Sequence, residues 1–234
     1  MVLIPFLLSL FLFLTACDKE KKKETSLTYE VNISKFLEQT YAPYLPRFEP
    51  PQPGTYQLPV IKCVSDHLLI DKTGGRLSLF SLKRDKIAVI SFIYINCYDF
   101  YGCSMANYYM SLLNKEVNTD KDLSKKVILM SISFDYERDT PEVIREYSRS
   151  LYTTPNWVFL TTEGGRELEG LLSDFGQRVQ KLYDEKGNWL GFRHTLKVYL
   201  VDKKNCIRNI YSIGMLYHKL VLNDIRTLLL EEVK

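Results

Sequence analysis

The sequence predicts an α/β fold in which a central mixed sheet is flanked by helices. Two apolar runs, Ile87–Ile95 and Val127–Phe134, have the length and the β-branched content of buried central strands. An amphipathic segment follows each run, so strand and helix alternate along this part of the chain. A hairpin and a terminal amphipathic helix complete the order. The pattern predicts one sheet with helices on both faces, preceded by an N-terminal β-hairpin.

Length and composition limit the class of protein. The chain has 234 residues, 46% of them hydrophobic, which is enough for one core with appended segments. The formal net charge is only +3, so no broad basic face is expected and nucleic acid is not a predicted partner.

The N-terminal sequence predicts a targeting signal. Residues 2–16 are almost continuously apolar, too short a run for a comfortable membrane-spanning helix and typical of a signal-peptide core. The run ends in Leu-Thr-Ala-Cys17, which resembles the bacterial lipoprotein box, in which the cysteine is acylated and residues 1–16 are removed. No Lys or Arg precedes the run, so an uncleaved short membrane anchor is the alternative. Asp18 resembles an inner-membrane retention signal, which predicts the extracytoplasmic face of the bacterial plasma membrane.

A linker is predicted to separate this anchor from the folded domain. Lys19–Lys23 lie in a charged, solvated run, and Tyr29–Tyr41 could form a short helix. Five prolines between Pro43 and Pro53 favour an extended spacer. We therefore predict a charged and Pro-rich linker over residues 17–53 and a domain over residues 54–234.

The domain opens with a predicted hairpin and continues with alternating elements. Gln57–Ile70 and Arg76–Leu79 are the predicted hairpin strands, and a Gly-containing turn joins them. A helix is expected from about Ser104, and Asp139 or Thr140 can cap the next one, which has proline in its first turn. The later elements are a strand at Val158–Leu160, a helix at Glu167–Phe175, hairpin strands at Leu196–Asp202 and Ile207–Ser212, and a terminal helix through Leu220, Ile225 and Leu229.

Two cysteines, Cys97 and Cys103, follow the first buried strand and precede its helix. This places both sulfurs at the carboxyl end of a strand and the positive end of a helix, where backbone dipoles stabilise thiolate. Buried cysteines often serve only as small apolar side chains. A polar loop containing Gly102 fits reactive thiols better than core filling.

Four blocks, FIYINCYDFYGCSMA, SISFDYERDTPEVIREY, NWVFLT and RHTLKVYLVD, resemble the Sco/SenC family of thioredoxin-like proteins in sequence and in order. The resemblance implies a thioredoxin-like fold and a membrane-anchored protein that binds a copper ion and helps assemble the binuclear copper site of cytochrome c oxidase. The implied partner is the copper-bearing oxidase subunit or another copper or thiol client. By motif match, the implied copper ligands are Cys97, Cys103 and His194. Asp135 matches an acidic position near the family's site, where it could orient His194 or tune the thiols.

The residue types suit this chemistry, because copper(I) prefers thiolate and imidazole suits both oxidation states of copper. His194 lies just before an apolar strand, at a strand end. His67 and His218 fall outside the matching blocks and are interpreted as ordinary polar residues. A thiol–disulfide oxidoreductase that cycles Cys97 and Cys103 without metal is the leading alternative, and a scaffold without either activity is a third.

The spacing of the cysteines departs from the family pattern. This chain has C-x5-C where the family has C-x3-C, and the neighbouring proline is absent. Residues six apart on a helix are turned by about 240°, so both sulfurs cannot share an ion from one regular helix. A bulged loop is predicted, and Asp99 and Gly102 suit a turn within it. The departure affects copper affinity and reduction potential more than the fold.

Cys63 and Cys206 are the two remaining domain cysteines. A structural disulfide between them is conceivable in an oxidising compartment. Two independent thiols are the alternative.

Overall fold

The structure is a computed structural model that describes residues 48–97, 99, 102–151, 153–212 and 214–231. The predicted signal peptide, the lipidation site at Cys17 and the short helix at Tyr29–Tyr41 lie outside the described residues. Within the described ranges, no helix is both long enough and apolar enough to cross a bilayer.

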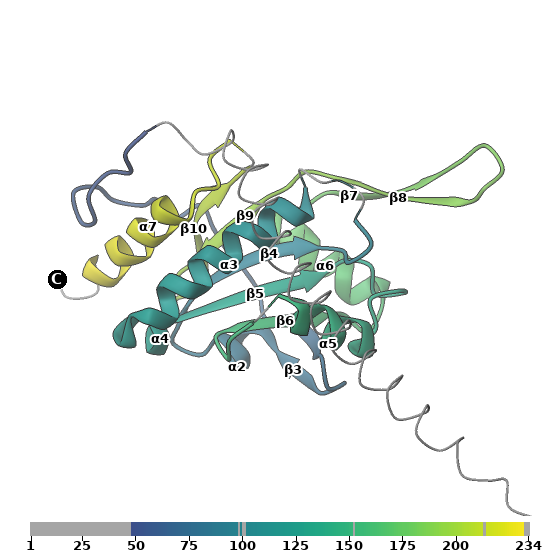
Figure 1. Ribbon diagram of the computed structural model, residues 1–234, viewed down its shortest axis with the longest axis horizontal. Coiled ribbons are helices and arrows are strands. Elements are labelled where there is room, and N and C mark those ends of the chain that lie inside the picture. The colour runs from purple at the N-terminus through teal and green to yellow at the C-terminus, as the bar shows by residue number, and fades with distance from the viewer. Residues whose placement is uncertain (1–47, 98, 100–101, 152, 213, 232–234) are drawn as a thin grey trace, which may run out of the picture. The chain divides into compact units, whose positions relative to one another are not determined.

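A mixed eight-stranded sheet, in the order β1-β10-β9-β4-β5-β6-β2-β3, forms the centre of the domain (Figure 1). Its central strand β4 (Ile87–Ile93) is buried at every residue and pairs in parallel with β5 (Val127–Ser133) and antiparallel with β9 (Val198–Val201). The predicted mixed sheet is confirmed. The remaining strands of this sheet are β1 (Lys62–Cys63), β2 (Leu68–Asp71), β3 (Arg76–Ser78), β6 (Trp157–Thr161) and β10 (Cys206–Tyr211).

Helices cover both faces of the sheet. Ser91 of β4 and Phe159 of β6 share a face through their common register with β5, whereas Phe92 points to the opposite face. Tyr147 packs on Phe159, and Phe175 packs on Phe92, so their two helices lie on opposite faces. The helices are α2 (Leu79–Lys83), α3 (Cys103–Thr119), α4 (Lys121–Lys126), α5 (Pro141–Ser150), α6 (Gly165–Phe175) and α7 (His218–Glu231), with α3 and α7 side by side (Figure 1).

The starts of two helices follow local sequence signals. Helix α3 begins at Cys103, one residue before the predicted start. Helix α5 begins at Pro141 with Thr140 as its N-cap residue, which resolves the choice between Asp139 and Thr140. Proline suits the first helical position because its missing N–H would have no partner there.

The prediction of one strand over Gln57–Ile70 is wrong. Strand β1 pairs with β10, whereas β2 pairs with β3 and β6 on the far side of the sheet. Between them the chain contacts the end of α6, where the Asp174 carboxylate accepts hydrogen bonds from Ser65 N and the His67 ring at 2.8 and 2.9 Å. These polar contacts interrupt the strand. The hairpin of β2 and β3 is present as predicted.

A second hairpin, formed by β7 (Val179–Tyr183) and β8 (Trp189–His194), was absent from the prediction. It follows α6 and projects beyond the main sheet (Figure 1). Its turn is closed by the Asp184 carboxylate, which accepts hydrogen bonds from the backbone N–H groups of Lys186 and Asn188. The last residue of this hairpin is His194, one of the copper ligands that the resemblance implies.

The first described residues are held on helix α7. Asn223 donates a hydrogen bond to the Pro51 carbonyl, and the Gly54 N–H donates to Thr227 Oγ1 at 3.0 Å. The Tyr56 hydroxyl donates to Asp224 at 2.5 Å. Side chains of α7 therefore hold this irregular segment in place.

Candidate metal centre

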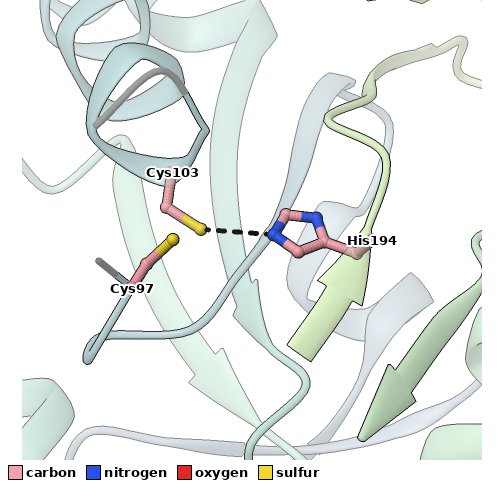
Figure 2. A group of neighbouring side chains, drawn as sticks. All are labelled: Cys97, Cys103 and His194. Carbon is pink, nitrogen blue, oxygen red and sulfur yellow. Dashed lines mark hydrogen bonds between the residues drawn. The ribbon is translucent and has the colours of Figure 1, made fainter. Parts of the chain in front are cut away.

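Three potential ligands from distant parts of the chain converge at one end of the sheet. Cys97 lies after β4, Cys103 is the first residue of α3, and His194 is the last residue of β8. One ligand atom from each lies within 4.8 Å of the other two (Figure 2). Within the described residues, no other three His, Cys, Asp or Glu side chains form such a group.

A tight turn places Cys103 at the start of α3. The Gly102 N–H donates to the Asp99 carbonyl at 3.1 Å, in agreement with the predicted turn. A Cβ atom on Gly102 would lie 2.9 Å from Asp99 Oδ2, so the absent side chain permits this close approach. Cys97 and Cys103 can thus face one another because only Cys103 belongs to the helix.

Aromatic packing orients His194. Its Nε2 atom faces Cys103 Sγ at 3.8 Å, and both sulfurs lie on the same side of the ring (Figure 2). The ring packs edge-on against Phe134 and Tyr94, with centroid distances of 4.9 and 6.0 Å. Nδ1 is buried and has no hydrogen-bond partner among the described residues. The aromatic rings of Phe134 and Tyr94 therefore position the His194 imidazole. Metal-binding histidines more often donate their second N–H to a polar partner.

The two thiols differ in charge. The pKa of Cys97 is lowered to about 4, chiefly because the Cys103 thiol donates a hydrogen bond to its sulfur, which outweighs the effect of burial. The pKa of Cys103 is raised, because its proton is held by Cys97 and because its sulfur is buried. Cys97 is therefore the thiolate of the pair, and Cys103 holds the remaining proton.

The donor set fits a soft metal ion. Two sulfurs and one imidazole nitrogen favour soft and borderline cations over hard ones. Cys97 is partly exposed and Cys103 is buried, so the site is open on the Cys97 side. An ion there would be reachable by another protein.

Asp135 was predicted to lie near this centre, whereas His67 and His218 were interpreted as ordinary polar residues. The Asp135 carboxylate accepts a hydrogen bond from Arg138 at 3.0 Å and, within the described part of the chain, forms no hydrogen bond with the three converging side chains. His67 is paired with Asp174, and His218 begins α7, so neither belongs to the centre.

Asp139 is a site residue that sequence reasoning missed. Its carboxylate does not cap α5 but accepts a hydrogen bond from the backbone N–H of Ile95, two residues before Cys97, at 3.0 Å. A polar residue directly after a buried strand was the available signal, but its partner is a backbone group that no sequence pattern identifies.

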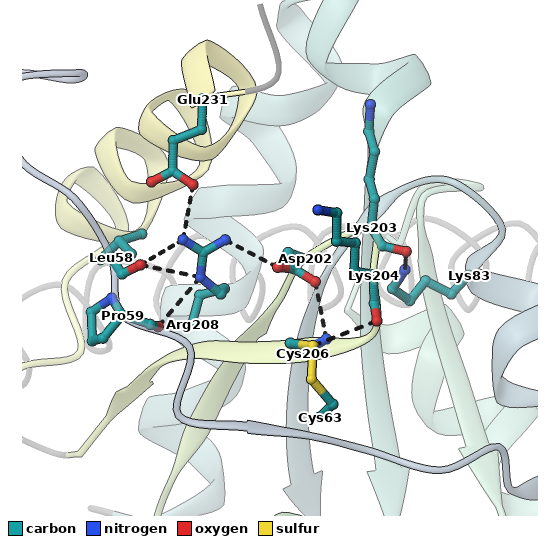
Figure 3. A network of polar contacts seen from close by, with 10 residues as sticks. All are labelled: Leu58, Pro59, Cys63, Lys83, Asp202, Lys203, Lys204, Cys206, Arg208 and Glu231. Atoms are coloured by element: carbon teal, nitrogen blue, oxygen red, sulfur yellow. Dashed lines mark hydrogen bonds and ion pairs between the residues drawn. A yellow bond between two sulfur atoms is a disulfide. The ribbon is translucent and has the colours of Figure 1, made fainter. Parts of the chain in front are cut away.

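Cys63 and Cys206 form a disulfide that joins β1 to β10 (Figure 3). Cys206 is buried, and its backbone N–H donates a hydrogen bond to Asp202 Oδ1 at 2.9 Å. The bridge lies apart from the Cys97–Cys103 pair, which remains unbridged.

The chain matches a known protein family and several solved structures. The SCO1/SenC family model matches residues 59–230. No curated protein sequence matches the chain. Among solved structures, ScoI of Bradyrhizobium japonicum, solved with copper bound, has 23% identity and a TM-score of 0.55, over 69% of this chain and 99% of that one.

Two other solved relatives are similar to the same extent. A SCO1/SenC family lipoprotein from Bacillus anthracis has 23% identity and a TM-score of 0.61, over 73% of this chain and 97% of that one. BsSco, a member of the Sco family of cytochrome c oxidase assembly proteins with a disulfide switch, has 23% identity and a TM-score of 0.58, over 74% and 96%. These likenesses show the thioredoxin-like fold, and the family match shows that this chain belongs to the SCO1/SenC family.

Proposed function

We propose that this protein is a copper metallochaperone for assembly of the binuclear copper site of cytochrome c oxidase. The copper ion is its cargo, and Cys97, Cys103 and His194 are the ligands. The observation that carries the proposal is the convergence of two sulfurs and one imidazole nitrogen within 4.8 Å. Family membership and the copper-bound relative from Bradyrhizobium japonicum support it. The client is the copper-bearing oxidase subunit or another copper or thiol protein.

The protein's own groups suit loading and release of such an ion. Cys97 is already a thiolate, so binding must remove only the Cys103 proton. His194 needs no reorientation, because its Nε2 already faces the sulfurs. The partly exposed Cys97 gives a client access to the ion for ligand exchange.

The proposal includes an anchored, extracytoplasmic location. Residues 1–16 are the signal peptide, Cys17 is the acylated residue, and residues 17–53 are the linker to the domain at residues 54–234. The lipoprotein-like box at Cys17 and the lipoprotein from Bacillus anthracis support this organisation. The Cys63–Cys206 disulfide fits an oxidising compartment. Mass spectrometry should find an acylated N-terminal Cys17 in membrane extracts, and an intact Met1 would contradict the proposal.

A thiol–disulfide oxidoreductase is the second candidate, and the low pKa of Cys97 favours it. The Cys97 thiolate would attack a client disulfide, and Cys103 would then resolve the mixed disulfide. Two electrons pass to the client with the Cys103 proton, solvent supplies the second proton of the client dithiol, and a Cys97–Cys103 bridge is left. This cycle does not need His194.

Copper binding to variants of the purified chain separates the two candidates. In a Cys17→Ser background, a thiol count first establishes that only Cys97 and Cys103 are reduced, and copper(I) is then titrated against a chelator. We expect one ion per chain, loss of tight binding in Cys97→Ser, and weakened binding in His194→Ala with thiol exchange retained. His67→Ala and His218→Ala are the matched controls, because they remove the chain's other two histidines. Unchanged affinity in His194→Ala would reject the three-ligand site.

A further inference from the structure

Asp139 is a buried carboxylate that the copper-binding chemistry above does not use. Its side chain is 0% exposed, and it lies between the end of β5 and the start of α5. Its Oδ2 atom accepts the Ile95 N–H at 3.0 Å and the Ser133 hydroxyl at 2.5 Å. One carboxylate oxygen thus joins the segment before Cys97 to the carboxyl end of a central strand.

The surrounding groups hold this carboxylate in one orientation. Ser133 Oγ donates to Asp139 and accepts the Asp135 N–H at 3.0 Å. The Asp139 N–H in turn donates to the Asp135 carbonyl at 2.8 Å. The two hydrogen bonds of Ser133 are buried and the Ile95 bond is partly buried, so rotation of Asp139 would leave the Ile95 N–H without its carboxylate partner, which costs free energy where water has little access.

The same turn is also connected to the hairpin that carries His194. The Asp135 carboxylate accepts from Arg138, whose guanidinium lies 3.8 Å above the Trp189 ring on β8. Trp189 contacts Phe192, two residues before His194, at a centroid distance of 5.8 Å. Residues 135–139 therefore contact both the cysteine segment and the histidine strand.

We propose that Asp139 is a positioning residue. It holds the segment before Cys97 so that the Cys97 sulfur lies close to Cys103 and His194. The predicted effect of Asp139 on copper affinity rests on the proposed function, whereas its predicted effect on the thiol pair does not. Loss of the Asp139–Ile95 bond frees the backbone two residues before Cys97 and lowers the frequency with which the two sulfurs meet. Both the bridged form and the metal-bound form become less favourable.

The test compares three variants of the full chain. Asp139→Ala removes the acceptor, whereas Asp139→Asn retains one oxygen that can accept from Ile95 and Ser133. Asp224→Ala is the matched control, because it removes a buried carboxylate whose partners, Tyr56, Asn209 and Tyr211, lie outside the centre. Each is equilibrated with dithiothreitol and its oxidised form, and each is titrated with copper(I) after reduction.

We expect Asp139→Ala to make the Cys97–Cys103 bridge about tenfold easier to reduce, which is a rise of about 30 mV for a two-electron couple. Its copper affinity should fall about 10- to 100-fold, as for other losses of supporting contacts at metal sites. Asp139→Asn should restore most of both properties. Asp224→Ala should lower the melting temperature without changing either.

Two results would overturn the proposal. One is an Asp139→Ala variant with the potential and affinity of the parent, which would limit Asp139 to stability. The other is an Asp139→Asn variant as impaired as the alanine, which would assign the effect to charge. If Asp139→Ala does not fold, Ser133→Ala must shift both readouts in the same direction, and no shift would reject the proposal. A parent chain that binds no copper would reject the proposed function, while the bridge potential would still test Asp139.

Discussion

At the scale of single residues, the division of charge between Cys97 and Cys103 has a measurable consequence. Cys97 has a pKa of about 4 because Cys103 donates a hydrogen bond to it. In metal-free, reduced protein, alkylation of Cys97 by iodoacetamide should therefore rise through a midpoint near pH 4, since only the thiolate above its pKa reacts. Cys103→Ala removes the donor and should move the midpoint upward, towards the usual range of a thiol. Peptide mass spectrometry at each pH measures both.

Cys103 provides the internal control for this experiment. It is buried and its pKa is raised, so it should stay unlabelled over the same range of pH. A Cys97 midpoint near pH 9 in both proteins would contradict the assigned thiolate.

The residues of the centre differ in how far sequence alone could identify them. The two cysteines stand out because they follow a buried strand, but no local sequence signal marks His194, and not His67 or His218, as a ligand. Only the family resemblance distinguished it, and the structure then brings it beside the thiols. Asp139 could not be identified in this way, because its partner is the N–H of Ile95 and any residue type supplies that donor.

At the scale of elements, strands buried on both faces were the most predictable. β4 and β5 are predominantly apolar runs, and their short length and β-branched residues favour a buried strand over a buried helix. The hairpin of β7 and β8 was missed because polar residues interrupt both strands, although Asp184 and Gly187 mark its turn. Strand β1 was misplaced because its partner, β10, lies far along the chain and tertiary contacts decide the pairing.

The missed hairpin gives a prediction about how His194 is held. Trp189→Ala removes the ring beneath Arg138, a contact that contributes about 0.5–2 kcal/mol in other proteins. His194 ends the same strand, so copper affinity should fall about tenfold. The Cys97–Cys103 potential should stay unchanged, because those segments keep their own contacts. A copper competition titration and a dithiol equilibration measure the two effects.

Tyr183→Ala is the matched control for this variant. Tyr183 lies opposite Trp189 in the hairpin register and is 55% exposed, so its loss should leave copper affinity intact. Equal losses in both variants would show that general loosening of the hairpin, and not the contact with Arg138, affects the centre.

At the scale of the whole molecule, the N-terminal and C-terminal parts of the domain are joined at the edge of the sheet away from β2 and β3. The Cys63–Cys206 bridge closes a loop with a sequence separation of 143. Beside it, Arg208 donates to the Leu58 carbonyl and pairs with Asp202 and Glu231 (Figure 3). The bridge and this network act on the same edge, so both oppose separation of the first strand from the rest of the sheet.

The bridge should be a major source of stability that is independent of the metal centre. A disulfide closing a loop this long restricts the unfolded chain, and loss of a native disulfide typically costs about 2–5 kcal/mol. For a domain of this size, that corresponds to a fall of roughly 4–20 °C in melting temperature. We expect this fall when Cys63→Ser and Cys206→Ser are combined in a Cys97→Ser, Cys103→Ser background, measured by scanning calorimetry. Dithiothreitol should lower the melting temperature of the background protein by a similar amount and leave the protein without the bridge unchanged. A background protein insensitive to the dithiol, with both sulfurs shown to be reduced, would mean that strand pairing and the Arg208 network hold the edge without the bridge.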